Sequence, residues 1–360
     1  MEIHTKNCKI SFFLPSLNIG GVENVFITYA NELSCRGYRV EFALCKKIGD
    51  LIPLVSNDIN IVNLGDVQLR YALFRLRKYI RISHPDILIT GGDFPNMMLV
   101  LASLMLKERP QIILSKHNYQ NVETKGLGWW AKLDLFLQKL LYPKADNIIA
   151  VSRGIEKYLI ECLRIKPSKI SQICNPIDIE NVLKKGDEIF CMPLPDKYIV
   201  FVGRLGKVKN IPLLLKAFDG LDDKGLHLVI VGDGPERESL EGISQQQSSR
   251  DRIHFLGSVS NPMPIIKKSR TLVLCSFSEG YPTVLLEAMI FNIPIVATPT
   301  EGAIEILKNI DGTYILNSFT DINEMINCLN NSVLSNCHIS DYVSKNEKSR
   351  VLDSFEELIM

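Results

Sequence analysis

The 360-residue sequence lacks several features that mark specialised classes of protein. Its nine cysteines include no Cys-x-x-Cys pair, so we predict neither a zinc site nor a disulfide framework and expect reduced thiols in the cytosol. No apolar run reaches the ~18 residues of a membrane-spanning helix, and the apolar segment 10–14 is too short for a signal peptide. The sequence also contains no internal repeat, no low-complexity tract and no Asp-x-Asp pair.

The composition that remains is that of a globular protein, with 46% hydrophobic and 22% charged residues. A chain of this length exceeds one ordinary core, so two domains are the default expectation. The net charge of +1 hides an asymmetry, because residues 1–178 carry 23 Lys and Arg against 16 Asp and Glu, whereas residues 179–360 carry 18 against 24. The split indicates that one half faces something anionic, although no nucleic-acid partner is predicted.

Two series of apolar runs alternate with helix-length amphipathic stretches along the chain. The first series is KISFFL, RVEFAL, DINIVNL, DILIT, QIILS and NIIAVS, and the second is YIVFVG, HLVIVG, RIHFLG, TLVLCS and PIVAT. Because these runs show little alternation of polar and apolar residues, they predict parallel strands that are buried on both faces. The expected fold class is therefore α/β, with two doubly wound Rossmann-like domains.

The same alternation predicts where the domains begin and end. An N-terminal domain is expected over residues 1–178 and a C-terminal domain over residues 198–340. The segment 179–197 loses periodicity and contains Pro193 and Pro195, which is typical of a linker. Residues 341–360 include SRVLDSFEELI, a helical pattern that either stays with the C-terminal domain or returns to the N-terminal one.

The turns after the predicted strands are the places to look for chemistry, because ligands of open parallel sheets bind where strands lead into helix N-termini. Gly20 and Gly21 follow the first strand and would let a phosphate approach the backbone, but a tight turn without a ligand fits as well. After YIVFV, Arg204 and Lys209 precede a helix that Asn210 is expected to cap. A guanidinium fork, an ammonium and helix N–H groups are the parts of a diphosphate site, and a solvated basic loop is the alternative.

The turn VIVGDGPERESL contains a Gly-x-Gly that suggests a dinucleotide-binding fingerprint. However, Arg237 stands at the third-glycine position, and the fingerprint belongs at the start of its domain. A tight strand-to-helix turn with acidic residues at the helix start is the better interpretation.

The stretch SFSEGYPTVLLEAM places Glu279 and Glu287 on either side of a Gly-Tyr-Pro turn. Pro282 suits the first position of a helix, so both carboxylates lie toward its positive end and are expected to stay ionised. Ionised carboxylates only accept hydrogen bonds, and they bind the vicinal hydroxyls of a sugar ring or a ribose well. For either glutamate alone, a capping or surface role is the better reading; beside the turn that carries Arg204 and Lys209, the pair favours a binding site.

Together these motifs resemble the retaining glycosyltransferases of family 4, which have the GT-B fold. The resemblance rests on Glu-x7-Glu with EGYP and LLEAM, on VGRL followed by KN, on the early GGVE, and on the phrases AVS and NPID. It runs from about Lys9 to about Leu316. It implies two domains that face each other across a cleft.

The resemblance also implies a role for each matching residue. Arg204 and Lys209 would hold the donor diphosphate, Glu279 the hydroxyls of the donor sugar, and Glu287 those of the ribose. Gly20, Gly21 and the backbone N–H groups of Thr283 and Val284 would approach the phosphate, and His117 would lie near donor and acceptor. For His117, a strand-end histidine with a backbone partner is an equal alternative. The catalytic set expected from the resemblance is His117, Glu279, Arg204 and Lys209.

The implied reaction is transfer of a hexose from a nucleotide-sugar, with UDP the commoner nucleotide in the family, to an acceptor hydroxyl with retention of configuration. Cations would stabilise the leaving diphosphate, and without an Asp-x-Asp pair we expect neither a metal nor another cofactor. Three alternatives differ in class. They are a sugar-nucleotide epimerase, a glycosidase and a non-catalytic nucleotide-sugar-binding subunit. A glycosidase has no use for a diphosphate cradle.

The expected acceptor is a growing glycan or a polyprenyl-diphosphate-linked sugar in surface polysaccharide synthesis of the O-antigen or capsule type. The stretch LRYALFRLRKYIRI carries Arg70, Arg75, Arg77, Lys78 and Arg81, and GLGWWAKLDLFLQKLLYPK carries both tryptophans. These basic and aromatic helices suit peripheral contact with an anionic membrane on its cytoplasmic side. The alternative is that their apolar stripes, such as Leu73, Leu76 and Ile80, face the protein core.

Overall fold

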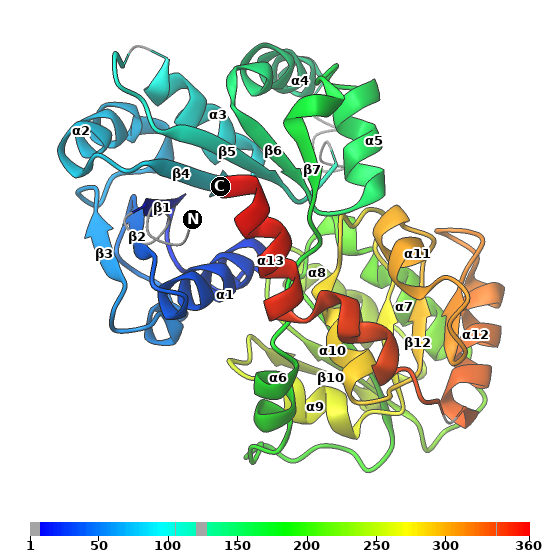
Figure 1. Cartoon of the computed structure of the whole chain (residues 1–360). Coiled ribbons are helices and arrows are strands. Elements are labelled where there is room, and N and C mark those ends of the chain that lie inside the picture. The colour runs from blue at the N-terminus through cyan, green and yellow to red at the C-terminus, as the bar shows by residue number, and fades with distance from the viewer. Residues whose placement is uncertain (1–7, 105, 120–127, 336) are drawn as a thin grey trace. The chain divides into compact units, whose positions relative to one another are not determined.

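The computed structural model describes residues 8–104, 106–119, 128–335 and 337–360, which divide into two compact α/β units. Among these residues, unit 1 contains the chain up to Ile177 together with Asn346–Met360, and unit 2 contains Asp178–Lys345. Figure 1 colours the chain from its N-terminus to its C-terminus and labels the elements. Each unit is built on one parallel sheet, as the uninterrupted apolar runs predicted.

The sheet of unit 1 has seven strands in the order β3-β2-β1-β4-β5-β6-β7, and all its neighbours run parallel. The strands are β1 (Lys9–Leu14), β2 (Arg39–Leu44), β3 (Asn60–Asn63), β4 (Ile87–Gly91), β5 (Gln111–Lys116), β6 (Asn147–Ala150) and β7 (Ile170–Gln172). The chain moves outward from β1 to β3 and then crosses to β4, so the winding direction reverses between β1 and β4. The crevice at the carboxyl ends of β1 and β4 is where a doubly wound sheet binds its ligand.

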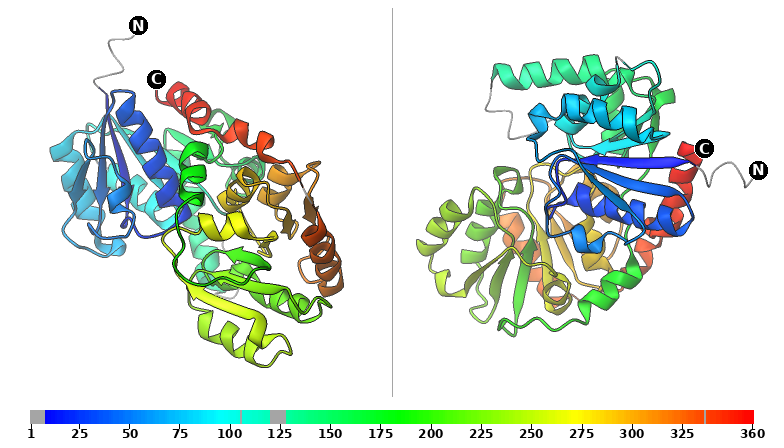
Figure 2. Two further views of the ribbon diagram at one scale, coloured as in Figure 1. Left: turned by 90° about the horizontal axis from the view of Figure 1, so that it is seen from below. Right: turned by 90° about the vertical axis from the view of Figure 1, so that its left-hand side faces the viewer.

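Helices cover both faces of the unit 1 sheet, as Figure 2 shows. They are α1 (Gly21–Cys35), α2 (Leu73–Ser83), α3 (Asp93–Ser103), α4 (Trp129–Leu141), α5 (Arg153–Glu161) and α13 (Lys348–Ile359). The C-terminal helix α13 packs beside α1, where the rings of Tyr29 and Phe355 stack with centroids 4.6 Å apart. Helix α3 contacts both α2 and α4 on the opposite face. The SRVLDSFEELI segment therefore lies within unit 1.

The sheet of unit 2 has six strands in the order β10-β9-β8-β11-β12-β13. The strands are β8 (Tyr198–Val202), β9 (His227–Val231), β10 (Ile253–Gly257), β11 (Thr271–Leu274), β12 (Ile295–Ala297) and β13 (Thr313–Ile315), and the helices are α6 (Ile179–Gly186), α7 (Ile211–Asp219), α8 (Arg237–Gln245), α9 (Met263–Lys268), α10 (Thr283–Ile290), α11 (Glu301–Leu307) and α12 (Ile322–Leu334). Here the winding direction reverses between β8 and β11, which places the ligand crevice at the carboxyl ends of those two strands.

Every apolar run in the two predicted series forms a strand, but two strands were not predicted. Both lie at sheet edges, and their sequences, ISQ in β7 and TYI in β13, are short, partly polar and not fully buried, so they give no apolar signal. The predicted linker 179–197 needs a correction, because its first residues form α6. This helix is capped by the Asp178 side chain and packs against α9 and α10 within unit 2. Its hydrophobic side is narrow, which is why a sequence window mistakes it for a connection.

Candidate active site

The predicted donor-site residues of unit 2 come from the two turns at its switch point. Arg204 and Lys209 follow β8, and Glu279 follows β11, the neighbouring strand. The two turns are fastened together, because the Phe277 amide donates to the Val208 carbonyl at 2.7 Å and the Cys275 thiol donates to the Lys209 carbonyl at 3.1 Å. The fold therefore holds these side chains on one rigid platform, formed by the turns after β8 and β11, although Lys209 and Glu279 lie about seventy positions apart along the chain.

Lys209 and Glu279 are in direct contact. The Lys209 ammonium donates to Glu279 Oε1 at 2.6 Å, and the Ser276 hydroxyl donates to the same oxygen at 2.6 Å. Their side chains are only 21% and 12% exposed, so solvent screens the pair weakly. The contact orients the ammonium and leaves Glu279 with its second oxygen as an acceptor. Such an arrangement offers a cation to a phosphate and a carboxylate to a hydroxyl within one small volume.

Arg204 lies in the same turn, two residues after the end of β8, and is exposed. No side-chain hydrogen bond or ion pair of Arg204 occurs among the residues that the structure describes. The turn beside it is held close by the neighbouring strand, because Gly232 has φ +133° and a Cβ there would meet the Gly203 carbonyl oxygen at 2.0 Å. A Cβ on Gly234 would likewise lie 2.4 Å from the Leu205 carbonyl oxygen. The Gly-x-Gly thus serves close backbone packing under the Arg204 turn, and Arg237 pairs with Asp233 and Glu241.

Helix α10 begins at this platform. Pro282 is its N-cap rather than its first residue, so the helix starts one residue later than predicted, with Thr283 and Val284 as its first two residues. Their N–H groups belong to the four at a helix start that lack intrahelical acceptors, and they carry the positive end of the helix dipole. This end of α10 suits an anion, as does the ammonium of Lys209.

The expectation that Glu287 stays ionised holds only in part. Glu287 lies on the fifth residue of α10, beyond the turn in which the helix dipole acts, and its side chain is half-buried. Burial raises the pKa of this carboxyl to about 7, and the more distant charge of Lys185 on α6 only partly opposes the shift. Near neutral pH, Glu287 is therefore poised between a form that only accepts hydrogen bonds and one that also donates.

The predicted cap at Asn210 also needs a correction. Asn210 occupies the N-cap position of α7 in the left-handed region, with φ 49°, and its side chain makes no capping hydrogen bond. Its amide instead donates to the Phe319 carbonyl at 2.8 Å. The residue thus fixes the sharp turn that follows Lys209 and ties it to the loop after β13.

In unit 1, Gly20 and Gly21 stand at the switch point, directly before and at the start of α1. Gly20 is extended, and a Cβ there would lie 2.1 Å from the Glu23 carboxylate, which folds back over the helix start. A Cβ on Gly21 would meet nothing within 4 Å. Open space above Gly21 is compatible with the predicted approach of a phosphate. Burial raises the pKa of Glu23, whose carboxyl also contacts its own backbone N–H.

His117 lies just beyond β5 and is buried, with 8% of its surface exposed. Its Nε2 lies 2.9 Å from the Ser115 hydroxyl, and its ring packs edge-on against Phe26 with centroids 6.1 Å apart. Burial, with help from the charge of Lys116, lowers the pKa of His117 to about 4. The imidazole is therefore neutral at physiological pH, which suits a hydrogen-bonding role rather than that of a cation.

Sequence reasoning missed a buried polar cluster next to His117. The Lys116 ammonium is fully buried and contacts the Asp93 carboxylate, which also accepts from the Tyr142 hydroxyl at 3.2 Å. Lys116 lies 3.3 Å from Gln138 of α4 as well. Asp93 opens α3 directly after Gly91 and Gly92, so it stands at the carboxyl end of β4 in the unit 1 crevice. The sequence signal for this cluster is the GGD turn after DILIT, a further strand-to-helix turn at the carboxyl end of a predicted strand.

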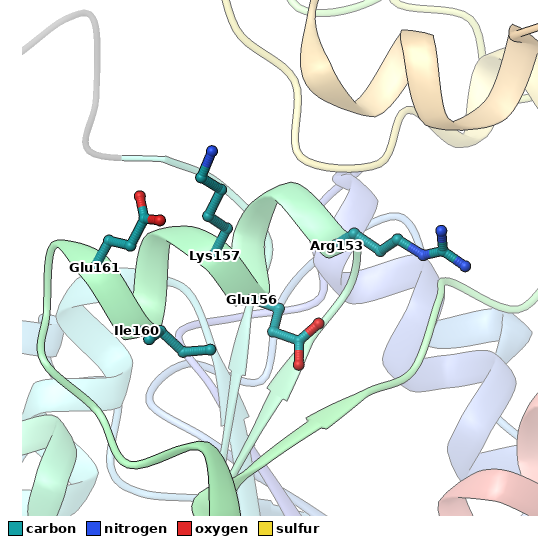
Figure 3. Close-up of a pocket in the computed structure, with 5 residues that line it drawn as sticks. All are labelled: Arg153, Glu156, Lys157, Ile160 and Glu161. Atoms are coloured by element: carbon teal, nitrogen blue, oxygen red, sulfur yellow. The ribbon is translucent and has the colours of Figure 1, made fainter.

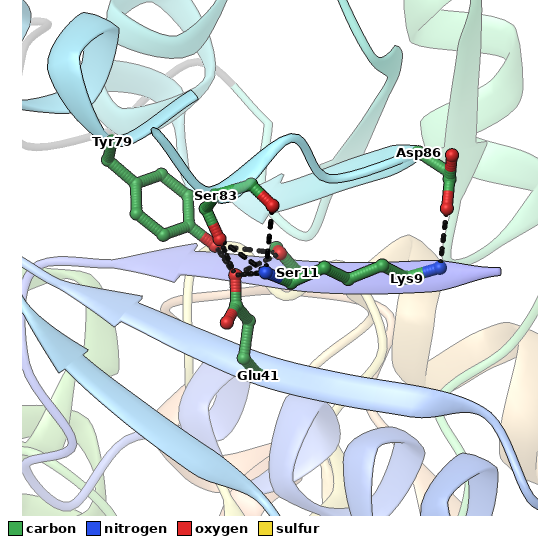
Figure 4. Close-up of polar contacts among 6 residues, drawn as sticks. All are labelled: Lys9, Ser11, Glu41, Tyr79, Ser83 and Asp86. Carbon is green, nitrogen blue, oxygen red and sulfur yellow. Dashed lines mark hydrogen bonds and ion pairs between the residues drawn. The ribbon is translucent and has the colours of Figure 1, made fainter. Parts of the chain in front are cut away.

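Two further polar groupings lie away from these crevices. Glu41 is buried near the amino ends of β1 and β2, where Lys9, Ser11, Tyr79 and Ser83 surround its carboxylate (Figure 4). Hydrogen bonds from these groups lower its pKa despite burial, so it is a structural carboxylate. A shallow hollow is lined by side chains of α5 alone, namely Arg153, Glu156, Lys157, Ile160 and Glu161 (Figure 3). Among the described residues, no group of three or more His, Cys, Asp or Glu is arranged to hold a metal.

Family models match almost the whole chain in two consecutive parts. Residues 19–181 match the model described as Glycosyltransferase Family 4, and residues 188–348 match the one described as Glycosyl transferases group 1. The chain belongs to the group 1 glycosyltransferases of family 4. It is therefore a glycosyltransferase, and the resemblance found in its motifs is confirmed.

Curated relatives of this glycosyltransferase act on glycans. It is 28% identical over 324 residues to an α-1,4-N-acetylgalactosaminyltransferase of Campylobacter jejuni that acts on a diphospho-undecaprenol-linked GalNAc acceptor, covering 85% of this chain and 84% of that one. It is 24% identical to an amylovoran biosynthesis glycosyltransferase of Erwinia amylovora over 81% of each. The acceptor and the polysaccharide named here are those of the two relatives.

Solved structures confirm the GT-B fold. The Anabaena HepE structure with UDP and glucose aligns with a TM-score of 0.79 at 16% identity and covers 98% of this chain and 99% of that one. A lipopolysaccharide outer core galactosyltransferase in its apo form aligns with a TM-score of 0.70 at 20% identity, again over 98% and 99%. At these identities, the likeness concerns the fold alone.

Proposed function

We propose that this glycosyltransferase transfers a hexose from a nucleoside diphosphate sugar, with UDP the expected nucleotide, to a glycan or polyprenyl-diphosphate-linked acceptor. The observation that carries the proposal is the pair of turns in unit 2, where Lys209 contacts Glu279 and Glu279 lies four residues before Thr283, the first residue of α10. An ammonium and free helix N–H groups suit a diphosphate, and the neighbouring carboxylates suit hydroxyls.

The proposed mechanism follows from the placement of these groups. The acceptor hydroxyl forms a bond to the anomeric carbon of the donor sugar as the bond from that carbon to the diphosphate breaks, and negative charge grows on the leaving phosphate. Arg204, Lys209 and the N–H groups of Thr283 and Val284 would stabilise that charge, and one preorganised donor is typically worth ~3 kcal/mol. Glu279 would accept from the donor sugar hydroxyls and Glu287 from those of the ribose. Gly20, Gly21 and His117 are proposed to approach the donor from unit 1.

Three finer features belong to the same proposal. The sugar keeps its anomeric configuration, as the family resemblance implies. Transfer needs no metal and no other cofactor, because cationic side chains supply the charge that a divalent ion would otherwise supply. The enzyme works in surface polysaccharide assembly of the O-antigen or capsule type, in the cytoplasm and peripherally at the inner face of the membrane. One relative that acts on an undecaprenol-linked acceptor and another that takes part in amylovoran biosynthesis support the role in polysaccharide assembly.

The test combines donor binding with product analysis. A panel of nucleotide-sugars is screened for thermal stabilisation of the protein, since a ligand that binds only the folded state raises its melting temperature. The donor found is then supplied with membrane lipid extracts, and the anomeric configuration of the product is read by NMR. Stabilisation and a retained linkage support the proposal. Binding without transfer would favour a non-catalytic binding subunit, and conversion of the sugar itself would favour an epimerase.

A further inference from the structure

Helix α4 leaves large apolar side chains uncovered along most of its length. Trp129, Leu133, Phe136 and Leu140 recur at spacings of four, three and four residues, which places them on one stripe of the helix. They are 60%, 37%, 61% and 53% exposed, and Trp130 stacks on Trp129 while 55% exposed itself. Within α4, only Gln138 and Leu141 are fully buried. The second of the two sequence alternatives, an apolar stripe that faces the core, is therefore wrong for this helix.

The neighbouring helices extend this uncovered surface. Helix α3 packs against both α2 and α4 on one face of the unit 1 sheet, so the sides of the three helices that face away from the sheet are adjacent (Figures 1 and 2). Phe74 and Ile82 of α2 are 74% and 69% exposed. Leu101 and Leu104, at the end of α3, are 41% and 49% exposed. By contrast, Leu76 and Ile80 of α2 are buried, so that stripe does face the core.

The charges on α2 and α4 are nearly all positive, and the single charged residue of α3, Asp93, pairs with the buried Lys116. Helix α2 carries Arg75, Arg77, Lys78 and Arg81 with no acidic residue, and α4 carries Lys132 and Lys139 against the single acid Asp134. A second copy of this chain would bring this excess of positive charge against itself, which disfavours a symmetric dimer through this face. Apolar side chains surrounded by cations, with two tryptophans at one end, match the interfacial region of an anionic bilayer.

We propose that α4 is the element through which unit 1 enters the headgroup region of an anionic lipid bilayer, while the cations of α2 lie over the lipid headgroups. The inference deepens the proposed function, because a polyprenyl-linked acceptor would be presented at that surface. Its own support is the exposed helix. On its buried side, α4 is joined to the unit 1 crevice, since Gln138 contacts Lys116 and Lys116 contacts Asp93. The docking helix and the crevice thus share one rigid framework.

The full-length protein is mixed with vesicles of phosphatidylcholine, alone or combined with phosphatidylglycerol. The sequence has two tryptophans, both on α4, so their fluorescence reports directly on this helix. We expect a blue shift and strong binding with the anionic vesicles, weakening as salt is added, and little change with the neutral ones.

Two sets of variants separate the apolar and the charged contributions. Phe136→Ser with Leu140→Ser should weaken vesicle binding at least tenfold, whereas the matched control Ile189→Ser with Leu334→Ser, two exposed apolar residues of unit 2, should bind as the parent does. Replacing Arg75, Arg77, Lys78 and Arg81 with glutamine should remove the preference for anionic lipid. Melting temperatures of all variants check that they fold, and UDP-glucose binding, measured in parallel, should not change.

Several outcomes would overturn the inference. These are tryptophan emission that vesicles do not alter, equal losses in the α4 variant and its control, or salt-independent binding to neutral lipid. Light scattering that shows a dimer without lipid, abolished by Phe136→Ser with Leu140→Ser, would instead make this face a self-association surface. Failure of UDP-glucose and other donors to bind, with vesicle binding intact, would count against the proposed function and leave the docking surface standing.

Discussion

Replacing Glu287 with glutamine should make the protein more stable at alkaline pH and worse at binding its donor. The Glu287 carboxyl has a pKa of about 7 in the folded chain against an ordinary value of 4.5, because burial on α10 penalises its charge. Between these two pKa values the folded state holds a proton that the unfolded state has released, so stability falls as the pH rises from about 5 to above 7. The difference of about 2.5 pKa units corresponds to about 3 kcal/mol at pH 8.

The assay is thermal unfolding of the parent and Glu287→Gln at pH 5 and pH 8. Glutamine carries no charge to bury, so at pH 8 the variant should melt several degrees higher than the parent, at roughly 2–4 °C per kcal/mol for a unit of this size. At pH 5, where Glu287 is protonated, the two should melt within about 1 °C of each other. Glu238→Gln, at an exposed site on α8, is the control and should show no such pH-dependent gain.

Donor binding should change in the opposite direction. UDP-glucose is the probe, and its affinity for the parent should weaken as the pH falls through 7, because a protonated Glu287 accepts fewer hydrogen bonds from vicinal hydroxyls. Glu287→Gln should bind at least tenfold more weakly at pH 8 and lose that pH dependence. A variant that is less stable than the parent at pH 8 would refute the reasoning about the buried charge. A variant that binds UDP-glucose as the parent does would refute the ribose contact.

Three further predictions concern the platform and its surroundings. Glu279→Gln should lower turnover at least a hundredfold, because the donor sugar loses an acceptor and Lys209 loses its ion-pair partner; full activity would remove Glu279 from the site. Transfer should persist in EDTA, and activity that is lost there and restored by Mg²⁺ or Mn²⁺ would show that the cations alone do not suffice. Lys116→Met should lower the melting temperature, because it leaves Asp93 without its buried cation; unchanged stability would mean that the pair contributes little.

The fold could be predicted because each sheet is parallel and buried on both faces, which produces uninterrupted runs such as YIVFV and DILIT. The three-residue edge strands β7 and β13 have no such signal and depend on pairing with β6 and β12. Helix α6 was mistaken for a linker because its packing partners, α9 and α10, are distant in sequence. Local patterns fail where an element owes its existence to contacts with remote parts of the chain.

For the candidate site, strand-end position predicted which turns matter, and the structure brings Lys209 and Glu279 within 2.6 Å. The charge state of Glu287 could not be predicted, because burial of a helical carboxylate depends on the surrounding fold rather than on its distance from the helix start. The Asp93 and Lys116 pair escaped notice for the same reason, since Lys116 reads as a polar residue at the end of a strand. Exposure of the apolar stripe on α4 is likewise a property of the packed unit.

The most direct test of the central claim, that the unit 2 platform binds the donor diphosphate, is calorimetric titration of UDP into the parent, Lys209→Ala and Lys207→Ala. Lys207 lies on the same short turn and is exposed, so it controls for the loss of a nearby positive charge. The account predicts that the Lys209 variant loses at least a hundredfold in affinity, about 3 kcal/mol, while the Lys207 variant stays within a few-fold of the parent. Equal affinity in all three proteins, or equal loss in both variants, would contradict it.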